Sequence, residues 1–247
     1  ARYLHDSVEH LMTAYGRVDL LFWDYVSPWK TAADFDPDPL LEMIHRHQPG
    51  IIINDRLSDG AHRRGDYCTP EGGIPNHAPD LPWEVCAAMN FFWGYHRGAE
   101  VHMTPLQIQH GLMQCVSKGG NLLLNVGPDE RGRIPTMSER VMGQLAEWFA
   151  LHESSVRGCG PADHTPPAGC VYTKGEDGAL YLHLPLAPLG DVFLPGLKDR
   201  VESATVMRDG VSLPLEPVAA DYHPRDEVRL KTGGSTQSGD VVRLQLK

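Results

Sequence analysis

Apolar and polar positions along the first 155 residues predict helices and buried strands in turn. Residues 4–15 carry apolar side chains at helical spacing, and Gly16 is a residue type that ends helices. The run DLLFWD at residues 19–24 is apolar between its two acids, as expected for a strand of parallel sheet that is covered on both faces. The pattern then repeats, with a helix predicted within residues 40–50 and a strand in IIIND at residues 51–55.

Two further strand–helix pairs follow along the chain. Strands are predicted in WEVCAAMNFFWGY at residues 83–95 and in NLLLNVGP at residues 121–128. Each is followed by a helix whose start has the spacing of a capping box, TPLQ at residues 104–107 and TMSE at residues 136–139. In a capping box the Thr and the Glu or Gln side chains satisfy each other's backbone N–H groups.

Four strand–helix units at roughly thirty-residue spacing indicate an α/β fold with a parallel sheet. Polar residues close three of the strands: Asp24, the pair Asn54-Asp55, and Asn125. In (β/α)8 barrels the carboxyl ends of the strands build the active site. Four units are half of such a barrel, so we expect either a smaller open fold or the C-terminal half of a barrel.

After residue 158, the pattern of apolar and polar positions changes. GCGPADHTPPAG, at residues 158–169, is a turn-rich linker, and short apolar segments between turns predict antiparallel strands after it. We therefore predict two domains, an α/β partial barrel at residues 1–157 and a small β-sandwich at residues 158–247. The predicted strands are CVYTK (170–174), ALYLHL (179–184), DVFLPG (191–196), SATVMRDG (203–210), EVRLK (227–231) and DVVRLQLK (240–247).

Charge and cysteine content narrow the range of functions. The chain has 22 Lys and Arg residues against 32 Asp and Glu, a net charge of −10, which argues against nucleic-acid or anionic-membrane partners. Its five cysteines lack CxxC spacing, so neither a zinc site nor a disulfide framework is predicted, although Cys159 and Cys170 could pair. The histidines show no metal-binding spacing. We expect no metal and no cofactor, and nothing distinguishes the cellular compartment.

Acidic residues stand beside aromatic residues in the loop-rich segments. Asp24 lies between Trp23 and Tyr25, and Glu84 follows Trp83. Aromatic rings stack on the apolar faces of sugars, and glycoside hydrolysis uses two carboxyls on separate loops. Each acid also has an ordinary structural interpretation, such as a helix cap or a solvated loop residue.

Five blocks, in order, resemble the family 29 glycoside hydrolases, the α-L-fucosidases. The strongest similarity is in SKGGNLLLNVGPDERGRIP, and the resemblance extends over about residues 1–155. The blocks are YGRVDLLFWDY (15–25), IIINDR (51–56), GDYCTPE (65–71), PWEVCAAMNFFWGYH (82–96) and VSKGGNLLLNVGPDERGRIP (116–135).

The resemblance implies a retaining, exo-acting α-L-fucosidase that removes terminal α-L-fucose by double displacement. Asp24 stands at the family's nucleophile position, and Glu71 of the TPE block is our choice for the acid/base. Glu84 is the second choice, with a supporting role in the site as its alternative. The TPE block resembles the subgroup that prefers α-1,3/1,4-linked fucose.

The resemblance also suggests residues that contact the substrate. Trp93 corresponds to a residue that lines the fucose pocket, and Trp29 is a candidate contact for the leaving group. Tyr25 is a candidate sugar platform, and Arg56 belongs to the scaffold of the site.

Family members carry a whole barrel, and no counterpart of the half upstream of the nucleophile is found here. We therefore expect a homo-oligomer, or a missing N-terminal half-barrel segment that completes the fold. An alternative is an inactive or fucose-binding truncated homologue that needs a partner half-barrel. The β-domain alone is a possible interaction module.

Overall fold

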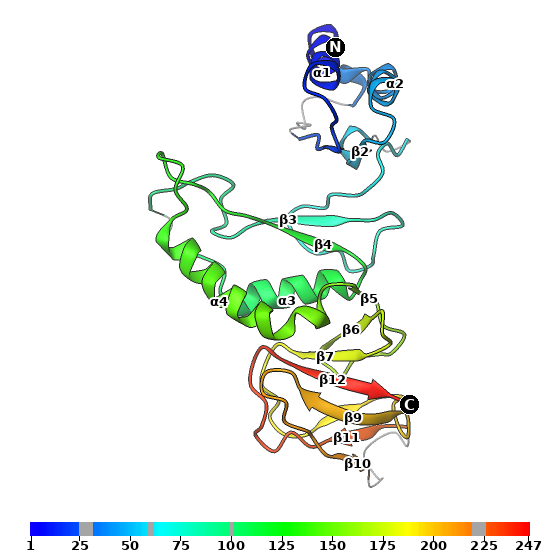
Figure 1. The fold of residues 1–247 in the computed structure, drawn as a ribbon, viewed down its shortest axis with the longest axis vertical. Helices are drawn as coiled ribbons and strands as arrows, with labels where there is room; N and C mark the ends of the chain where they lie inside the picture. Colours follow the sequence, from blue (N-terminus) through cyan, green and yellow to red (C-terminus); the bar gives the residue numbers. More distant parts are fainter. Residues whose placement is uncertain (25–31, 59–61, 99–100, 219–225) are drawn as a thin grey trace. The chain divides into compact units, whose positions relative to one another are not determined.

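The computed structural model describes residues 1–24, 32–58, 62–98, 101–218 and 226–247. The chain divides into two compact units. Unit one comprises residues 1–70 and 79–84, and unit two comprises residues 71–78 and 85–247 (Figure 1).

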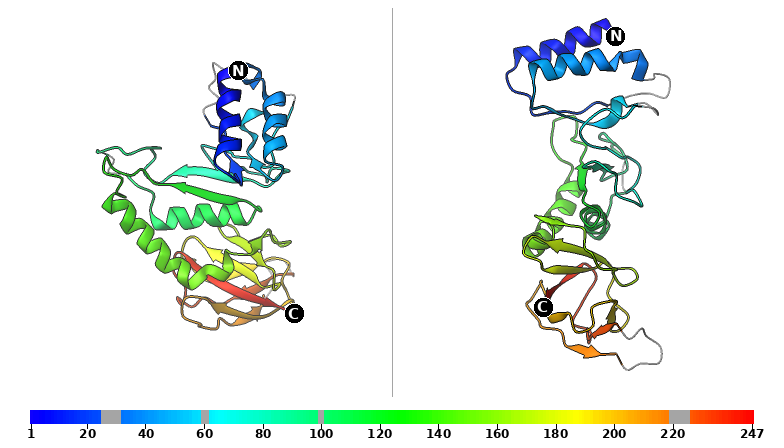
Figure 2. Two further views of the ribbon diagram at one scale, coloured as in Figure 1. Left: turned by 45° about the horizontal axis from the view of Figure 1, so that its top comes forward. Right: turned by 90° about the vertical axis from the view of Figure 1, so that its right-hand side faces the viewer.

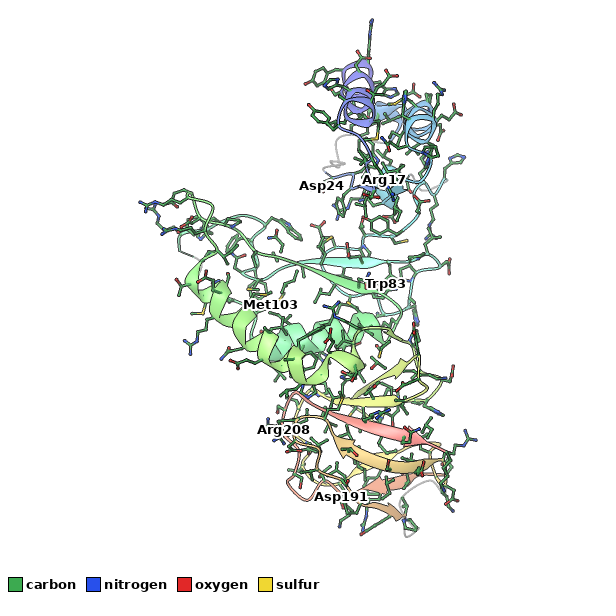
Figure 3. The ribbon with its side chains drawn as sticks, in the orientation of Figure 1. Arg17, Asp24, Trp83, Met103, Asp191 and Arg208 are labelled. Atoms are coloured by element: carbon green, nitrogen blue, oxygen red, sulfur yellow. The ribbon has the colours of Figure 1, made fainter. Side chains whose placement is uncertain are left out.

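Unit one packs two helices against short parallel strands. The helices α1 (Arg2–Ala14) and α2 (Pro37–His47) run side by side (Figure 2). β1 (Leu20–Leu21) pairs in parallel with β2 (Ile52–Ile53), and Asp24 follows β1 (Figure 3). The short 3-10 helices η1 (Ala32–Phe35) and η2 (Asp55–Leu57) complete the unit. Its buried core consists of Val8, Met12, Leu40, Ile44, Ile51, Ile53 and Leu57.

The parallel pairing continues beyond β2 through single bridges. Asn54 pairs with Tyr67 and Cys68 pairs with Trp83, both in parallel. Unit one therefore contains four neighbouring parallel segments, and the one at Tyr67 and Cys68 was not among the predicted strands.

β1 is shorter than the strand predicted over residues 19–24. The side-chain amide of Asn54 forms hydrogen bonds with both backbone polar groups of Trp23. It accepts from the N–H of Trp23 at 2.8 Å and donates to the C=O of Trp23 at 2.9 Å. Those groups are therefore not available for regular sheet pairing, and the ladder stops at Leu21.

The first part of unit two contains two strands and two helices. β3 (Glu84–Ala88), whose first residue belongs to unit one, pairs with β4 (Asn121–Asn125). The helices are α3 (Pro105–Val116) and α4 (Thr136–His152), followed by the 3-10 helix η3 (Glu153–Ser155). Their shared core contains Met89, Ile108 and Val141, with Leu122 and Leu124 of β4 packed against it.

One of the two predicted capping boxes forms. Thr104 Oγ1 accepts from the N–H of Gln107, and the Gln107 side chain accepts from the N–H of Thr104, as predicted. The second prediction is wrong, because α4 starts with Thr136 and Pro135 is its N-cap. Thr136 is thus already helical, one position too late to cap the first turn.

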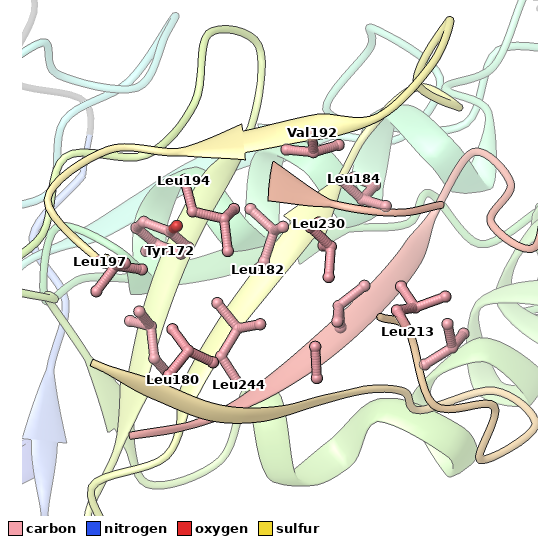
Figure 4. Close-up of a cluster of buried hydrophobic side chains, with 14 residues drawn as sticks. Tyr172, Leu180, Leu182, Leu184, Val192, Leu194, Leu197, Leu213, Leu230 and Leu244 are labelled. Atoms are coloured by element: carbon pink, nitrogen blue, oxygen red, sulfur yellow. The ribbon is translucent and has the colours of Figure 1, made fainter. Parts of the chain in front are cut away.

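The remainder of unit two is an antiparallel sandwich. One sheet has the strand order β5-β6-β7-β12-β9, and the other has the order β10-β11-β8. Leucine and valine side chains from both sheets fill the space between them (Figure 4). The strands are β5 (Cys159–Gly160), β6 (Val171–Gly175), β7 (Leu180–Leu184), β8 (Val192–Leu194), β9 (Val201–Val206), β10 (Leu215–Pro217), β11 (Val228–Leu230) and β12 (Asp240–Leu246).

Four of these strands lie within predicted segments, and β6 and β9 overlap predicted segments, whereas β5 and β10 were not predicted. β5 has two residues, too few for an alternating pattern, and it pairs with β6 from within the segment predicted as linker. All five cysteines are free, so the suggested pairing of Cys159 with Cys170 is wrong. No helix among the described residues is long and apolar enough to cross a membrane.

Candidate active site

Asp24 and Arg56 form a contact at the end of β1 in unit one. Arg56 Nη1 donates to Asp24 Oδ1 at 2.7 Å. The Arg56 side chain is 19% exposed and that of Asp24 is 66% exposed. A mostly buried cation thus holds one carboxylate oxygen, while most of the Asp24 side chain faces solvent.

The guanidinium of Arg56 is fixed from two further sides. Its Nε donates to Thr69 Oγ1 at 3.1 Å. Its central carbon lies 5.0 Å from the centroid of the Phe22 ring, a cation–π distance. Arg56 therefore reaches Asp24 from a defined position.

Asn54 fixes the backbone next to Asp24. It is 0% exposed, and its amide forms the two hydrogen bonds to Trp23 described above. Because Trp23 immediately precedes Asp24, this contact limits how far the Asp24 backbone can shift.

Glu84 lies in the same unit, beside the segment that carries Thr69. Cys68 bridges Trp83, and the N–H of Glu84 donates to the C=O of Cys68 at 2.9 Å. In a parallel pair, Thr69 and Glu84 are then the next neighbours along the register. Asp24, Arg56, Thr69 and Glu84 come from four successive parallel segments of unit one.

Burial changes the acidity of Glu84. The side chain is half-buried, and loss of solvation raises the pKa of its carboxyl above the ordinary value. Desolvation has this effect because it disfavours the charged form. A carboxyl with a raised pKa is suited to act as a general acid.

Glu71 is exposed and belongs to unit two, where it bridges Cys86 in parallel. Trp93, also in unit two, is 51% exposed. Its C=O accepts from Asn125 Nδ2 at 2.8 Å, so the residue that closes β4 holds the backbone at Trp93.

Gly127, in the loop after β4, allows close packing against the loop that carries Trp93. A Cβ at Gly127 would lie 2.5 Å from the carbonyl carbon of Gly94, a distance that real side chains do not reach. The loop after β4 therefore packs backbone to backbone against the loop that carries Trp93.

Unit two also has a cavity of about 540 Å³ between β3, β4 and α3. Its lining is mainly apolar and includes Ile74, Val85, Trp93, Met103, Ile108 and Leu124. Among the described residues that line this cavity there is no carboxylate, so these residues lack the groups that glycoside hydrolysis requires.

The sequence-predicted residues thus fall into three groups. Asp24, Arg56 and Glu84 lie in unit one, and Glu71 and Trp93 lie in unit two. Tyr25 and Trp29 lie outside the described residues. Among the described residues, no three His, Cys, Asp or Glu side chains gather as a metal-binding group.

Thr69 was missed by the sequence reasoning. It is 7% exposed and contacts the side chains of Asn54, Asp55 and Arg56. Its only sequence signal is a hydroxyl residue two positions before Glu71, which does not by itself indicate a role.

Comparison with known proteins gives one consistent family. The model of the α-L-fucosidase family matches residues 1–154. The plasma α-L-fucosidase of Rattus norvegicus is 32% identical over 111 residues, which are 43% of this chain and 24% of that protein. The chain therefore spans about a quarter of the length of this curated relative.

Solved structures are similar over the whole chain. Alpha-L-fucosidase isoenzyme 1 from Paenibacillus thiaminolyticus matches 100% of this chain and 62% of its own, with a TM-score of 0.88 and 32% identity. An α-L-fucosidase from Bacteroides thetaiotaomicron, described as a trapped covalent intermediate with 2-fluoro-fucosyl fluoride, matches 100% of this chain and 60% of its own, with a TM-score of 0.84 and 20% identity. The predicted fold class, a partial (β/α) barrel followed by an antiparallel β-sandwich, is confirmed.

Proposed function

Because the chain belongs to the α-L-fucosidase family, we propose that the protein removes terminal α-L-fucose from glycans as a retaining, exo-acting glycosidase. The observation that carries the proposal is the Asp24 carboxylate, held at one oxygen by a mostly buried arginine and otherwise open to solvent. In the proposed reaction no cofactor takes part, and the substrate is a fucosylated oligosaccharide or glycoconjugate. A preference for α-1,3/1,4 linkages is proposed from the TPE block alone.

We assign Asp24 as the nucleophile. One oxygen of its carboxylate attacks the anomeric carbon while the glycosidic bond breaks, giving a covalent fucosyl–enzyme intermediate. Water then cleaves this ester and restores the original anomeric configuration. The contact with Arg56 supports the role, because it orients the carboxylate through one of its two oxygens.

Two residues are proposed for the acid/base, which must protonate the leaving oxygen and then activate water. Glu71 is proposed from the TPE block, and Glu84 is the second candidate. Burial and the raised pKa support Glu84, since an acid must be protonated when the glycosidic bond breaks. Retaining enzymes place the two carboxyls about 5–5.5 Å apart.

The substrate contacts and domain roles are also proposals. We propose that Trp93 stacks on the sugar, that Tyr25 and Trp29 lie near it, and that Arg56 borders the reacting carbon. We further propose that residues 1–157 form the catalytic domain and residues 158–247 the sandwich domain. All the sandwich strands begin at or after Cys159, which supports the boundary.

An additional chain segment is proposed to cover part of unit one. Leu20 and Ile52 pair directly across β1 and β2, and each is 48% exposed. Exposed neighbouring apolar side chains on a sheet favour association. We propose that a second copy of the chain, or a further barrel segment, covers them.

Replacing Asp24 by Ala tests the function. On an aryl α-L-fucoside and on a Lewis-type trisaccharide, we expect kcat to fall by about a thousandfold or more, because no intermediate can form. The control is Asp6→Ala, which removes an exposed acid of α1. Wild-type turnover in Asp24→Ala would contradict the assignment, and fucose binding by an inactive wild-type chain would favour the binding-protein alternative.

A further inference from the structure

We infer that Thr69 is a positioning residue that fixes Arg56, and through it Asp24, for the reaction. The inference rests on the proposed function of Asp24. Thr69 is 7% exposed and lies behind Arg56, so it would act through that arginine without touching the substrate.

The hydroxyl of Thr69 has a defined direction. Its backbone N–H donates to Asp55 Oδ1 at 3.0 Å, and its hydroxyl donates to the same oxygen at 3.3 Å. Because the single hydroxyl proton points to Asp55, the lone pairs of Oγ1 are free to accept. They accept from Arg56 Nε at 3.1 Å and from Asn54 Nδ2 at 3.4 Å.

Arg56 depends on this contact for its geometry. An arginine side chain has several rotatable bonds, and Asp24, its partner at the outer end, has a side chain that is 66% exposed. The hydrogen bond from Nε to Thr69 and the position of the guanidinium over the Phe22 ring together fix the plane of the guanidinium group. Nη1 then meets Asp24 Oδ1 at 2.7 Å from one direction.

Thr69 also joins the two groups that locate Asp24. Asn54 fixes the preceding backbone through Trp23, and Arg56 fixes the carboxylate itself. Both donate to the same hydroxyl, so the backbone and the side chain at Asp24 share one anchor.

The kinetic test compares Thr69→Val with Thr69→Ser. Val has nearly the shape of Thr but no hydroxyl, whereas Ser keeps the hydroxyl. We expect kcat/KM of Thr69→Val to fall about tenfold to a hundredfold, mainly through kcat, because a misplaced nucleophile slows the chemical step. Thr69→Ser should recover most of the activity.

A double-mutant cycle with Arg56→Lys distinguishes an effect of Thr69 that acts through Arg56 from a general disturbance of the structure. Lys has no Nε–H, so the contact with Thr69 is already lost in that variant. Adding Thr69→Val should then lower kcat/KM by less than twofold more. An unreduced effect of Thr69→Val in the Arg56→Lys background would overturn the inference.

A measurement without turnover distinguishes failure of this inference from failure of the proposed function. In 15N NMR spectra, the Nε–Hε proton of Arg56 should exchange slowly in the wild type and in Thr69→Ser, and at least tenfold faster in Thr69→Val. Unchanged exchange in a folded Thr69→Val protein would refute the positioning role. Absence of fucosidase activity with the expected exchange pattern would refute only the function.

Discussion

At the scale of single residues, Glu84 and Glu71 differ in solvation. Glu84 is half-buried and its carboxyl has a raised pKa, whereas Glu71 is exposed. A general acid must carry its proton when the glycosidic bond breaks, and burial favours the protonated form by penalising the charged form. The TPE block favours Glu71 as the acid/base, whereas this difference in solvation favours Glu84.

The variants Glu84→Gln and Glu71→Gln test that choice on substrates with good and poor leaving groups. We expect Glu84→Gln to lower kcat/KM for a poor leaving group by about a hundredfold or more, with a much smaller loss for an activated aryl fucoside. Glu71→Gln serves as the matched comparison and should show no such dependence on the leaving group. The reverse pattern would assign the role to Glu71.

The site could be predicted from the sequence only where a residue stands in a recognisable block. Asp24 and Arg56 belong to such blocks, and the structure brings them into contact. Thr69 could not be predicted, because its importance comes from three side chains that meet it from other positions along the chain. Asn54 was expected only as a polar residue at the end of a strand, and its hydrogen bonds to Trp23 depend on the pairing of β1 and β2.

At the scale of elements, helix interiors were easier to predict than strand ends. The apolar spacing located α1, α2, α3 and α4, because each buries one face against a core. The end of β1 depends on a side chain from another segment, so no local pattern contains it. The start of α4 was displaced by one residue because Pro135 occupies the N-cap in an extended conformation.

Two histidines of unit two are buried, one at the end of α4 and one in the sandwich. His152 of α4 is 2% exposed and His183 of β7 is 3% exposed. Burial lowers the pKa of both, for His183 to about 3. The Thr173 hydroxyl donates to the C=O of Ser155, so it accepts from His183 Nε2 at 2.8 Å, which identifies a neutral imidazole protonated at Nε2.

These histidines predict a dependence of stability on pH. Well above pH 6.5, the ordinary pKa of histidine, these side chains are neutral in the folded and in the unfolded chain. Their full contribution to the unfolding free energy is then present. As the pH falls below that value, the unfolded chain binds protons that the folded chain rejects, so the unfolding free energy decreases. His183 alone should remove roughly 2–3 kcal/mol between pH 7 and pH 4.5.

Urea unfolding at several pH values measures this slope. His183→Gln should flatten it, whereas His45→Gln, at an exposed position of α2, should leave it unchanged. An identical slope in wild type and His183→Gln would show that His183 does not contribute.

At the scale of the whole molecule, the order of elements was predictable and the assembly was not. Parallel strand–helix units followed by a sandwich were expected from periodicity, and the solved relatives confirm that fold class over the whole chain. The sequence does not determine what covers Leu20 and Ile52, because these residues have the same apolar character in a buried and in an exposed strand.

Light scattering on the 247-residue chain tests the proposed association. We expect a mass above the 27.3 kDa of one chain, because burying Leu20 and Ile52 removes apolar surface from water. Leu20→Glu with Ile52→Glu should shift the mass toward that of one chain. A monodisperse monomer in the wild type would argue against a second copy at this face.

The central claim is that Asp24 forms a covalent bond to fucose, and azide rescue of Asp24→Ala tests it most directly. With an activated aryl α-L-fucoside, azide should enter the space left by the carboxylate and restore turnover. The product should be the β-L-fucosyl azide, inverted at the anomeric carbon, because azide attacks from the nucleophile's side. Asp24→Ala that is fully active without azide, or an azide product with retained configuration, would contradict the account.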